Sequence, residues 1–135
     1  MTHLNNNDNI RKIVVKEGVK NIKRGAFYGC DNLAEVYIPS TIESIGYRIL
    51  GHSFNLEKIT GPFASDDGRC LVKDGVLEAF APKGILNYVV PDNVKEIRAS
   101  VFGSTRELES VILPEGLEII DEDAFRICPN LSSVT

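Results

Sequence analysis

The sequence has few of the residues on which catalytic and metal sites usually depend. Its 135 residues include no tryptophan, one methionine, two histidines and three cysteines. His3 and His52 belong to no metal-ligand spacing, and Cys30, Cys70 and Cys128 form no Cys-x-x-Cys pair. No phosphate-binding loop or dinucleotide fingerprint is present. The sequence therefore predicts no catalytic residue, no cofactor and no metal, and hence a protein that is not an enzyme.

Long apolar runs and an excess of positive charge are also missing. A membrane helix needs about 18 consecutive apolar residues, and no run approaches that length. The formal net charge is -4, and acidic and basic residues are interspersed rather than clustered as in nucleic-acid-binding proteins. We therefore expect no membrane insertion and no nucleic-acid partner. Residues 1–6 also lack the basic and apolar regions of a secretory signal, so either the protein stays inside the cell or a leader has been removed.

What the sequence does contain is an internal repeat. Units 10–32, 33–55, 85–107 and 108–130 are each 23 residues long, unit 56–84 has 29, and residues 131–135 begin a further unit. Apolar residues recur in the same columns of these units. Position 13 of the regular units, for example, reads Ile22, Ile45, Ile97 and Ile120. A fixed period of this kind is typical of a solenoid, so we expect residues 1–135 to form one domain of stacked coils.

The spacing within a unit predicts the course of one coil. Positions 4 and 6, such as Val36 and Ile38, share one face of a short strand, and Pro39 ends that strand. Positions 10–13 predict a second extended stretch, and pairs such as Ala124-Phe125 predict a helical turn that returns the chain. One coil cannot bury its apolar side chains alone. Stacking at about 4.8 Å per coil is therefore expected to form one continuous core.

Units of the form Leu-x-x-Ile-x-Ile-Pro-x-x-Val-x-x-Ile-Gly-x-x-Ala-Phe-x-x-Cys, closest at 33–53 and 108–128, resemble the BspA-like leucine-rich repeat. The resemblance covers residues 10–135. It implies a right-handed leucine-rich-repeat solenoid of α/β type, with parallel strands on the inner face, short second strands and helical turns outside, and one β-hairpin insertion. It also implies secreted or surface-attached bacterial proteins, some of which act as adhesins.

Two functions are consistent with this resemblance. The first is a non-enzymatic repeat scaffold that binds a protein or glycan ligand at a bacterial cell surface. The second is a structural spacer, or a fragment of a longer array, with no ligand of its own. The ends of the repeat show no polar cap, which also makes end-to-end self-association possible.

The long unit 56–84 contains a signal for a hairpin. Asp74-Gly75, between two apolar stretches, is typical of a two-residue turn. Pairing across this turn is expected to place one set of side chains against the stack: Cys70, Val72, Leu77 and Ala79. The opposite face is expected to carry Arg69, Leu71, Lys73, Val76, Glu78 and Phe80. The predicted hairpin replaces the outer part of the third coil, either as architecture or as a binding projection.

Positions 3 and 5 of the first strand are expected to point outward. The position-5 column is unusually apolar for an exposed position. It reflects either the preference of β-branched residues for strands or an interaction stripe anchored by Tyr37 and Ile112. The candidate binding face comprises Val14, Glu35, Tyr37, Lys58, Thr60, Asn87, Val89, Ser110 and Ile112.

The remaining candidates for chemistry have structural explanations. Cys30 and Cys128 share one column but lie four coils apart, about 19 Å, so no disulfide can join them. The cysteines are expected to be buried thiols. The acidic runs Asp66-Asp67 and 121–123 are interpreted as a turn and as the cap of a helical turn rather than as metal or acid-base sites.

Overall fold

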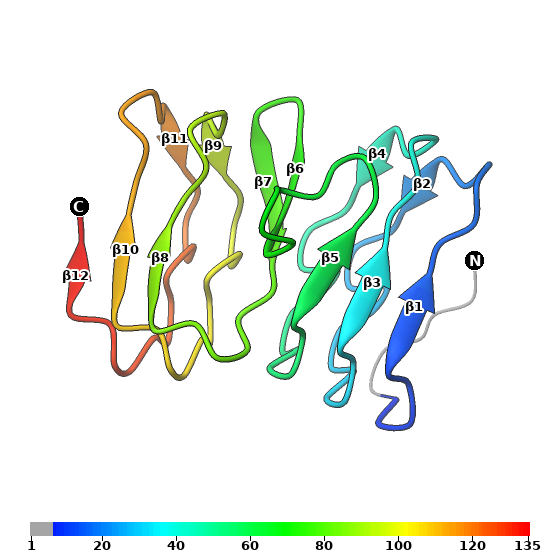
Figure 1. The fold of residues 1–135 in the computed structure, drawn as a ribbon, viewed down its shortest axis with the longest axis horizontal. Helices are drawn as coiled ribbons and strands as arrows, with labels where there is room; N and C mark the ends of the chain where they lie inside the picture. The colour runs from blue at the N-terminus through cyan, green and yellow to red at the C-terminus, as the bar shows by residue number, and fades with distance from the viewer. Residues whose placement is uncertain (1–6) are drawn as a thin grey trace.

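The computed structural model describes residues 7–135 and contains twelve strands and no helix within that range. The chain winds into a stack of coils, with β1 and β12 at opposite ends of its long axis (Figure 1). The strands are β1 (Lys12–Val14), β2 (Asn21–Ile22), β3 (Glu35–Tyr37), β4 (Ser44–Ile45), β5 (Lys58–Thr60), β6 (Cys70–Lys73), β7 (Val76–Phe80), β8 (Asn87–Val89), β9 (Glu96–Ile97), β10 (Ser110–Ile112), β11 (Ile119–Ile120) and β12 (Ser133–Val134).

Within coils one to three, and again from coil four onward, the first strand of each coil pairs in parallel with the first strand of the next, in the register that the 23-residue period predicts. Ile13 lies opposite Val36, and Val36 lies opposite Ile59, so β1, β3 and β5 form one ladder. β8, β10 and β12 form a second ladder in the same way. The predicted solenoid of parallel strands is therefore confirmed.

The second extended stretch of each coil is also a short strand. Ile22 pairs with Ile45 in β2 and β4, and Ile97 pairs with Ile120 in β9 and β11. Of this predicted isoleucine column, Ile22, Ile45 and Ile97 are buried, whereas Ile120 is 49% exposed. Ile120 lies in the last complete coil, where no further coil covers it.

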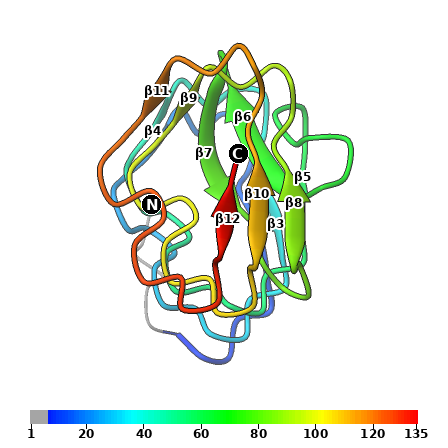
Figure 2. The ribbon, with the colours of Figure 1, turned by 90° about the vertical axis from the view of Figure 1, so that its left-hand side faces the viewer.

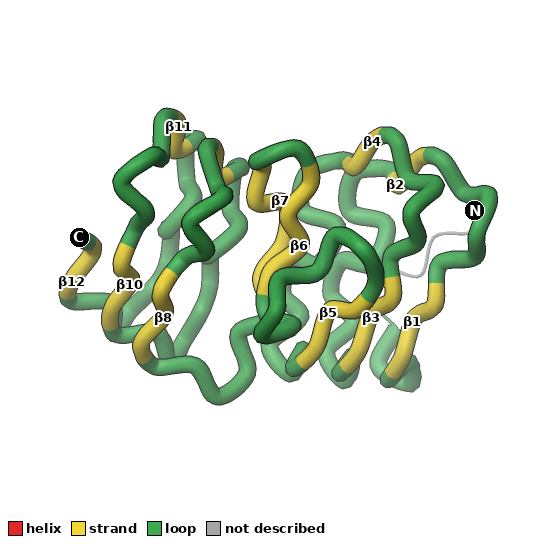
Figure 3. Tube along the Cα trace, turned by 45° about the horizontal axis from the view of Figure 1, so that its top comes forward, coloured by secondary structure: helices red, strands yellow, loops and turns green. Residues whose placement is uncertain are grey.

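The third side of the coil is not helical, so the predicted helical turns are wrong. The chain there runs as successive turns (Figure 3). Alternate amides donate to the neighbouring coil instead of to their own turn: the Phe27 amide donates to the Ile49 carbonyl at 3.0 Å, and the Phe102 amide to the Ala124 carbonyl at 2.9 Å. Carbonyls of the neighbouring coil accept these amides, so the amides do not need the local carbonyls, four residues earlier, that a helix would use.

The stack is not continuous, which corrects the prediction of one uninterrupted core. β5 and β8 belong to different sheets, and the buried apolar side chains form two clusters. The carbonyl of Gly68 accepts the Ile59 amide at 2.7 Å, so a loop covers the edge of β5 where β8 would have paired. The third coil is thus divided: its first strand ends one ladder, and its later strand β7 joins the ladder of β9.

β6 and β7 pair in antiparallel fashion across the Asp74-Gly75 turn. The predicted assignment of their faces is partly wrong, because Leu71 and Phe80, expected on the outer face, are 0% and 5% exposed. Two features explain this. The register shifts between Leu71 and Val72, and β7 runs through the middle of the coil outline seen along the stack (Figure 2), so that both of its faces meet other residues.

Candidate functional site

The outward side of the two first-strand ladders is called the front face here. Side chains alternate along each strand, so that Val36 and Val111 are fully buried while their neighbours point outward. Val14, Val89 and Ile112 are 56%, 63% and 51% exposed, respectively. The structure therefore confirms that position 5 points outward. The position-5 residues form one column on each ladder.

The first patch consists of Val14, Tyr37 and Thr60, which lie opposite one another on β1, β3 and β5. The Tyr37 hydroxyl donates to a Glu17 carboxylate oxygen at 3.3 Å, and its partial burial together with this carboxylate raises the pKa of Tyr37. Beside this column lie the position-3 residues of the same strands. They are Lys12 and Glu35, which form an ion pair at 3.4 Å, and Lys58.

The second patch consists of Val89, Ile112 and Thr135. Val89 lies opposite Ile112, and the Leu113 amide donates to the Thr135 carbonyl at 2.7 Å. In the adjacent position-3 column the Ser110 hydroxyl donates to the side-chain oxygen of Asn87 at 2.6 Å. This patch is more apolar than the first because its two aliphatic side chains are both more than half exposed.

The two patches do not join into one stripe. The prediction placed Thr60 beside Val89, but their strands are unpaired, and the loop after β5 lies between the ladders (Figure 1). A groove of about 510 Å³ opens at this break, lined in part by Pro62, Asp66, Asp67 and Asp92. The candidate face is therefore bipartite, with an acidic groove beside the break.

A polar cluster that runs from the buried Cys70 to the exposed Asp67 closes the break. The Tyr88 hydroxyl lies 3.0 Å from an Asp67 carboxylate oxygen and 3.0 Å from the Cys70 sulfur. The Ser65 hydroxyl donates to Asp67 at 2.6 Å and accepts the Cys70 amide at 2.9 Å. These groups come from the loop, from β6 and from β8, so the spacing of the residues in the sequence gives no sign that they meet.

Protonation states in this cluster oppose nucleophilic chemistry. Burial raises the pKa of the Cys70 thiol to about 12, and burial together with Cys70 and Asp67 raises the pKa of Tyr88. Burial would raise the pKa of Asp67 too, but hydrogen bonds from Ser65, the Arg69 amide and Tyr88 lower it overall. The thiol therefore stays protonated at neutral pH, and the cluster joins two ladders rather than activating an attacking group.

The other residues considered for chemistry lie apart. The His52 ring lies between the rings of Tyr28 and Phe54, with centroids 4.9 and 5.4 Å away, and His3 lies outside the described residues. Cys128 is partly buried, and its thiol donates to the Phe102 carbonyl at 3.0 Å. Within residues 7–135 no group of three or more His, Cys, Asp or Glu side chains could hold a metal ion, and no helix is long and apolar enough to cross a membrane.

Comparison with known proteins identifies the repeat. The family model described as "BspA type Leucine rich repeat region" matches the sequence in six copies, over residues 2–66 and 77–135. The chain belongs to this family. The unmatched residues between the two ranges cover β6 and the Asp74-Gly75 turn. No curated protein matches the sequence.

Solved structures of bacterial leucine-rich-repeat proteins share the fold. A leucine-rich cell surface protein from Faecalibacterium prausnitzii is 22% identical with a TM-score of 0.67, and the match covers 92% of this chain and 41% of that one. The pneumococcal vaccine antigen PcpA is 20% identical with a TM-score of 0.71, covering 93% and 39%. A leucine-rich-repeat protein from T. pallidum is 28% identical with a TM-score of 0.59, covering 93% and 58%. The chain thus spans about two fifths of the length of the first two proteins.

Proposed function

We propose that this chain is a non-enzymatic repeat scaffold that binds a protein ligand at a bacterial cell surface through the two patches of the front face. The observation that carries the proposal is the exposure of Val14, Val89 and Ile112 on one side of the solenoid, each more than half exposed. Isolated apolar side chains on a surface are ordinary, but neighbouring apolar side chains such as Val89 and Ile112, which lie opposite each other on paired strands, resemble the apolar centre of a protein interface.

The location at a cell surface is supported by the relatives. One solved relative is described as a cell surface protein and another as a vaccine antigen. The non-enzymatic role is supported by the raised pKa of the Cys70 thiol, because a protonated thiol is a poor nucleophile.

A protein ligand fits the front face better than a glycan does. Among the position-5 residues Tyr37 alone is aromatic, and its hydroxyl is already engaged by Glu17. The side chains of the second patch are aliphatic and suit burial against other apolar groups, at roughly 25 cal/mol per Å² of area removed from water.

The test is binding of the purified chain to a panel of immobilised host matrix proteins and, in parallel, to a glycan array. We expect a protein from the panel to bind, and the double variant Val89→Ser with Ile112→Ser to lose about tenfold or more in affinity. The matched control is Ile119→Ser with Ile127→Ser, which changes two isoleucines that are 48% and 66% exposed on the other sides of the coil.

Three results contradict the proposal in different ways. Equal losses in both double variants would mean that the front face is not the site. Binding on the glycan array alone would replace the protein ligand with a carbohydrate. The absence of binding on both panels would favour a spacer without a ligand of its own.

A further inference from the structure

The third coil lacks the third side that the other complete coils have. Residues 46–55 carry coil two from β4 to the next unit along this side, whereas residues 81–84 do so for coil three. β7 takes a shorter path through the coil interior, as the view along the stack shows (Figure 2). The third sides of coils two and four therefore face each other across the place where a coil-three segment would run.

Both edges of this gap carry unused backbone groups. In coil one the amides of Gly25, Phe27 and Gly29 donate to coil two. One repeat later the corresponding amides are those of Arg48, Leu50 and His52, and within residues 7–135 none of them has a hydrogen-bond partner.

At the opposite edge, in coil four, the groups without a partner in the described part of the chain are carbonyls. In coil five the carbonyls of Ala124 and Arg126 accept amides of coil four. The corresponding coil-four carbonyls, those of Val101 and Gly103, have no donor among the described residues, and the same is true of Ala99. One edge thus presents a row of donors and the other a row of acceptors, which is the pattern that one added strand of main chain satisfies on both sides.

A side chain in the same gap is also without a partner. Ser53 is 3% exposed, and its hydroxyl forms no hydrogen bond within residues 7–135. The residue at the same repeat position in coil four, Thr105, donates to the Phe102 carbonyl at 2.8 Å and lies 3.3 Å from the Cys128 sulfur of coil five. Ser53 lacks the equivalent neighbour because coil three has no residue at this position.

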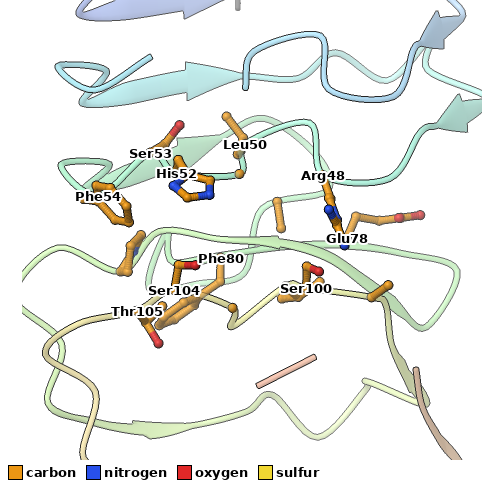
Figure 4. Close-up of a pocket in the computed structure, with 16 residues that line it drawn as sticks. Arg48, Leu50, His52, Ser53, Phe54, Glu78, Phe80, Ser100, Ser104 and Thr105 are labelled. Atoms are coloured by element: carbon orange, nitrogen blue, oxygen red, sulfur yellow. The ribbon is translucent and has the colours of Figure 1, made fainter. Parts of the chain in front are cut away.

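The space between the edges is named the coil-three slot. One wall includes Leu50, His52 and Ser53, and the other includes Ser100, Ser104 and Thr105. Glu78 and Phe80 of β7 lie between the two walls, as the close-up shows (Figure 4). The cavity between the walls has a volume of about 40 Å³, and two neighbouring cavities of about 140 and 430 Å³ share Arg48 with it.

Two contacts between coils two and four frame the slot. The Arg98 guanidinium lies 3.8 Å from the Tyr47 ring centroid and donates to the Ile45 carbonyl at 2.7 Å. The Arg106 guanidinium lies 4.4 Å from the Phe54 ring centroid. These contacts bridge coils two and four at the two ends of the slot.

The repeat itself indicates which peptide fits. Each regular third side has two residues four apart in the left-handed region, and in coil one both are glycines, Gly25 with φ of 65° and Gly29 with φ of 72°. Midway between them the inward residue is Phe27 in coil one and Phe102 in coil four, both fully buried. In the slot that inward space is taken by Phe80, whose ring centroid is 4.7 Å from that of Phe102, so a small residue is required there.

We propose that the coil-three slot binds a peptide segment of a partner protein with the pattern Gly-x-small-x-Gly, whose main chain runs parallel to residues 48–52 and 100–104 and completes both rows of backbone hydrogen bonds. A hydroxyl or thiol just after the second glycine pairs with Ser53. The slot lies on the third side of the coil and is separate from the front face, so this proposal does not depend on the protein ligand proposed above.

The test is an amide NMR titration of the full chain with the synthetic peptide Arg-Gly-Ala-Ala-Tyr-Gly-Ser, blocked at both ends. In the free chain we expect the amides of Leu50 and His52 to exchange with solvent roughly 100-fold or more faster than the bonded amides of Phe102 and Ser104. The peptide should protect Leu50 and His52 by tenfold or more and shift resonances along the slot, with a Kd on the order of 0.1–1 mM because a short free peptide loses much entropy on binding.

Controls separate main-chain pairing from nonspecific contact. The peptide Arg-Val-Ala-Ala-Tyr-Val-Ser should bind at least tenfold more weakly, because the left-handed region costs each β-branched valine roughly 1–2 kcal/mol. Ser53→Ala should weaken binding of the glycine peptide about fivefold, while Val89→Ser should leave it unchanged.

Four results would overturn the proposal. The first is slow exchange of Leu50 and His52 in the free chain, which would mean that the slot is closed. The second is the absence of any shift at millimolar glycine peptide, which would mean that the slot holds water alone. The third is equal binding of the valine peptide. The fourth is a set of shifts confined to the front face.

Discussion

Replacing Ser53 with alanine should stabilise the protein. The Ser53 hydroxyl is buried without a partner, and leaving a buried polar group unsatisfied costs about 1–3 kcal/mol. Alanine removes that group and leaves a void no larger than one oxygen atom. We therefore expect the free energy of unfolding to rise by about 1–2 kcal/mol, which corresponds to an increase of roughly 3–7 °C in Tm for a domain of this size.

The matched variant is Thr105→Val, at the same repeat position in coil four. The Thr105 hydroxyl donates to the Phe102 carbonyl at 2.8 Å, and valine keeps the shape of the side chain while removing the donor. We expect this variant to lose about 1–2 kcal/mol. Both substitutions remove a hydroxyl at the same repeat position, so opposite signs would show that the hydroxyl is bonded at Thr105 and not bonded at Ser53.

The assay is urea unfolding followed by circular dichroism, with calorimetry for Tm. An unchanged m-value in both variants would show that the midpoints report stability rather than a change in the unfolded state. If Ser53→Ala destabilises the chain as much as Thr105→Val does, then the Ser53 hydroxyl is bonded in solution. The argument that coil three leaves it without a neighbour would then be refuted.

Three further predictions test the fold. Ile97→Ala should lower the free energy of unfolding, measured by urea titration, by about 2–5 kcal/mol, because Ile97 is fully buried. Ile120→Ala should lower it by under about 1 kcal/mol, because Ile120 is 49% exposed. Similar losses in the two variants would contradict the described end of the stack. Gly61→Ala should lower Tm far more than Gly18→Ala, although both glycines have positive φ. An added Cβ at Gly61 would lie 2.1 Å from the Ile38 carbonyl oxygen, whereas one at Gly18 would meet nothing within 4 Å. Equal losses of Tm would count against this close approach. Because the folded-state pKa of Asp67 is lowered, its carboxylate stabilises the protein above about pH 4 and loses that effect as the pH falls through the folded-state pKa. Asp67→Asn should therefore be less stable than the native chain at pH 7, with the difference narrowing as the pH falls through the folded-state pKa of Asp67. A difference in stability that is constant with pH would rule out this role.

The repeat period made the coils predictable from the sequence. The columns at positions 4 and 13 placed Val36, Ile22, Ile45 and Ile97 in the core, and the structure confirms that they are buried. The same period predicted the parallel register, because residues 23 positions apart, such as Ile13 and Val36, must lie opposite each other when identical coils stack. The front-face positions followed from strand alternation alone.

The third side of the coil was not predictable in the same way. Ala-Phe pairs have apolar spacing that suits either a helical turn or a chain that bonds to its neighbours. The choice depends on whether another coil lies within hydrogen-bonding distance, as it does for the amides of Phe27 and Phe102. Non-glycine residues in the left-handed region, such as Arg48 and Ile127, also gave no sign in the sequence that this conformation recurs.

The break between the ladders depends on tertiary structure. The Asp74-Gly75 turn was readable as a hairpin from the sequence alone. The path of β7 through the coil interior was not, because it results from Phe80 packing on Phe102 and from Gly68 covering the edge of β5. Local sequence thus determined the period, the strands and the buried columns. Contacts between residues far apart in the chain decided the division of the front face into two patches and the opening of the coil-three slot, because they depend on which edge or space each neighbouring segment already occupies.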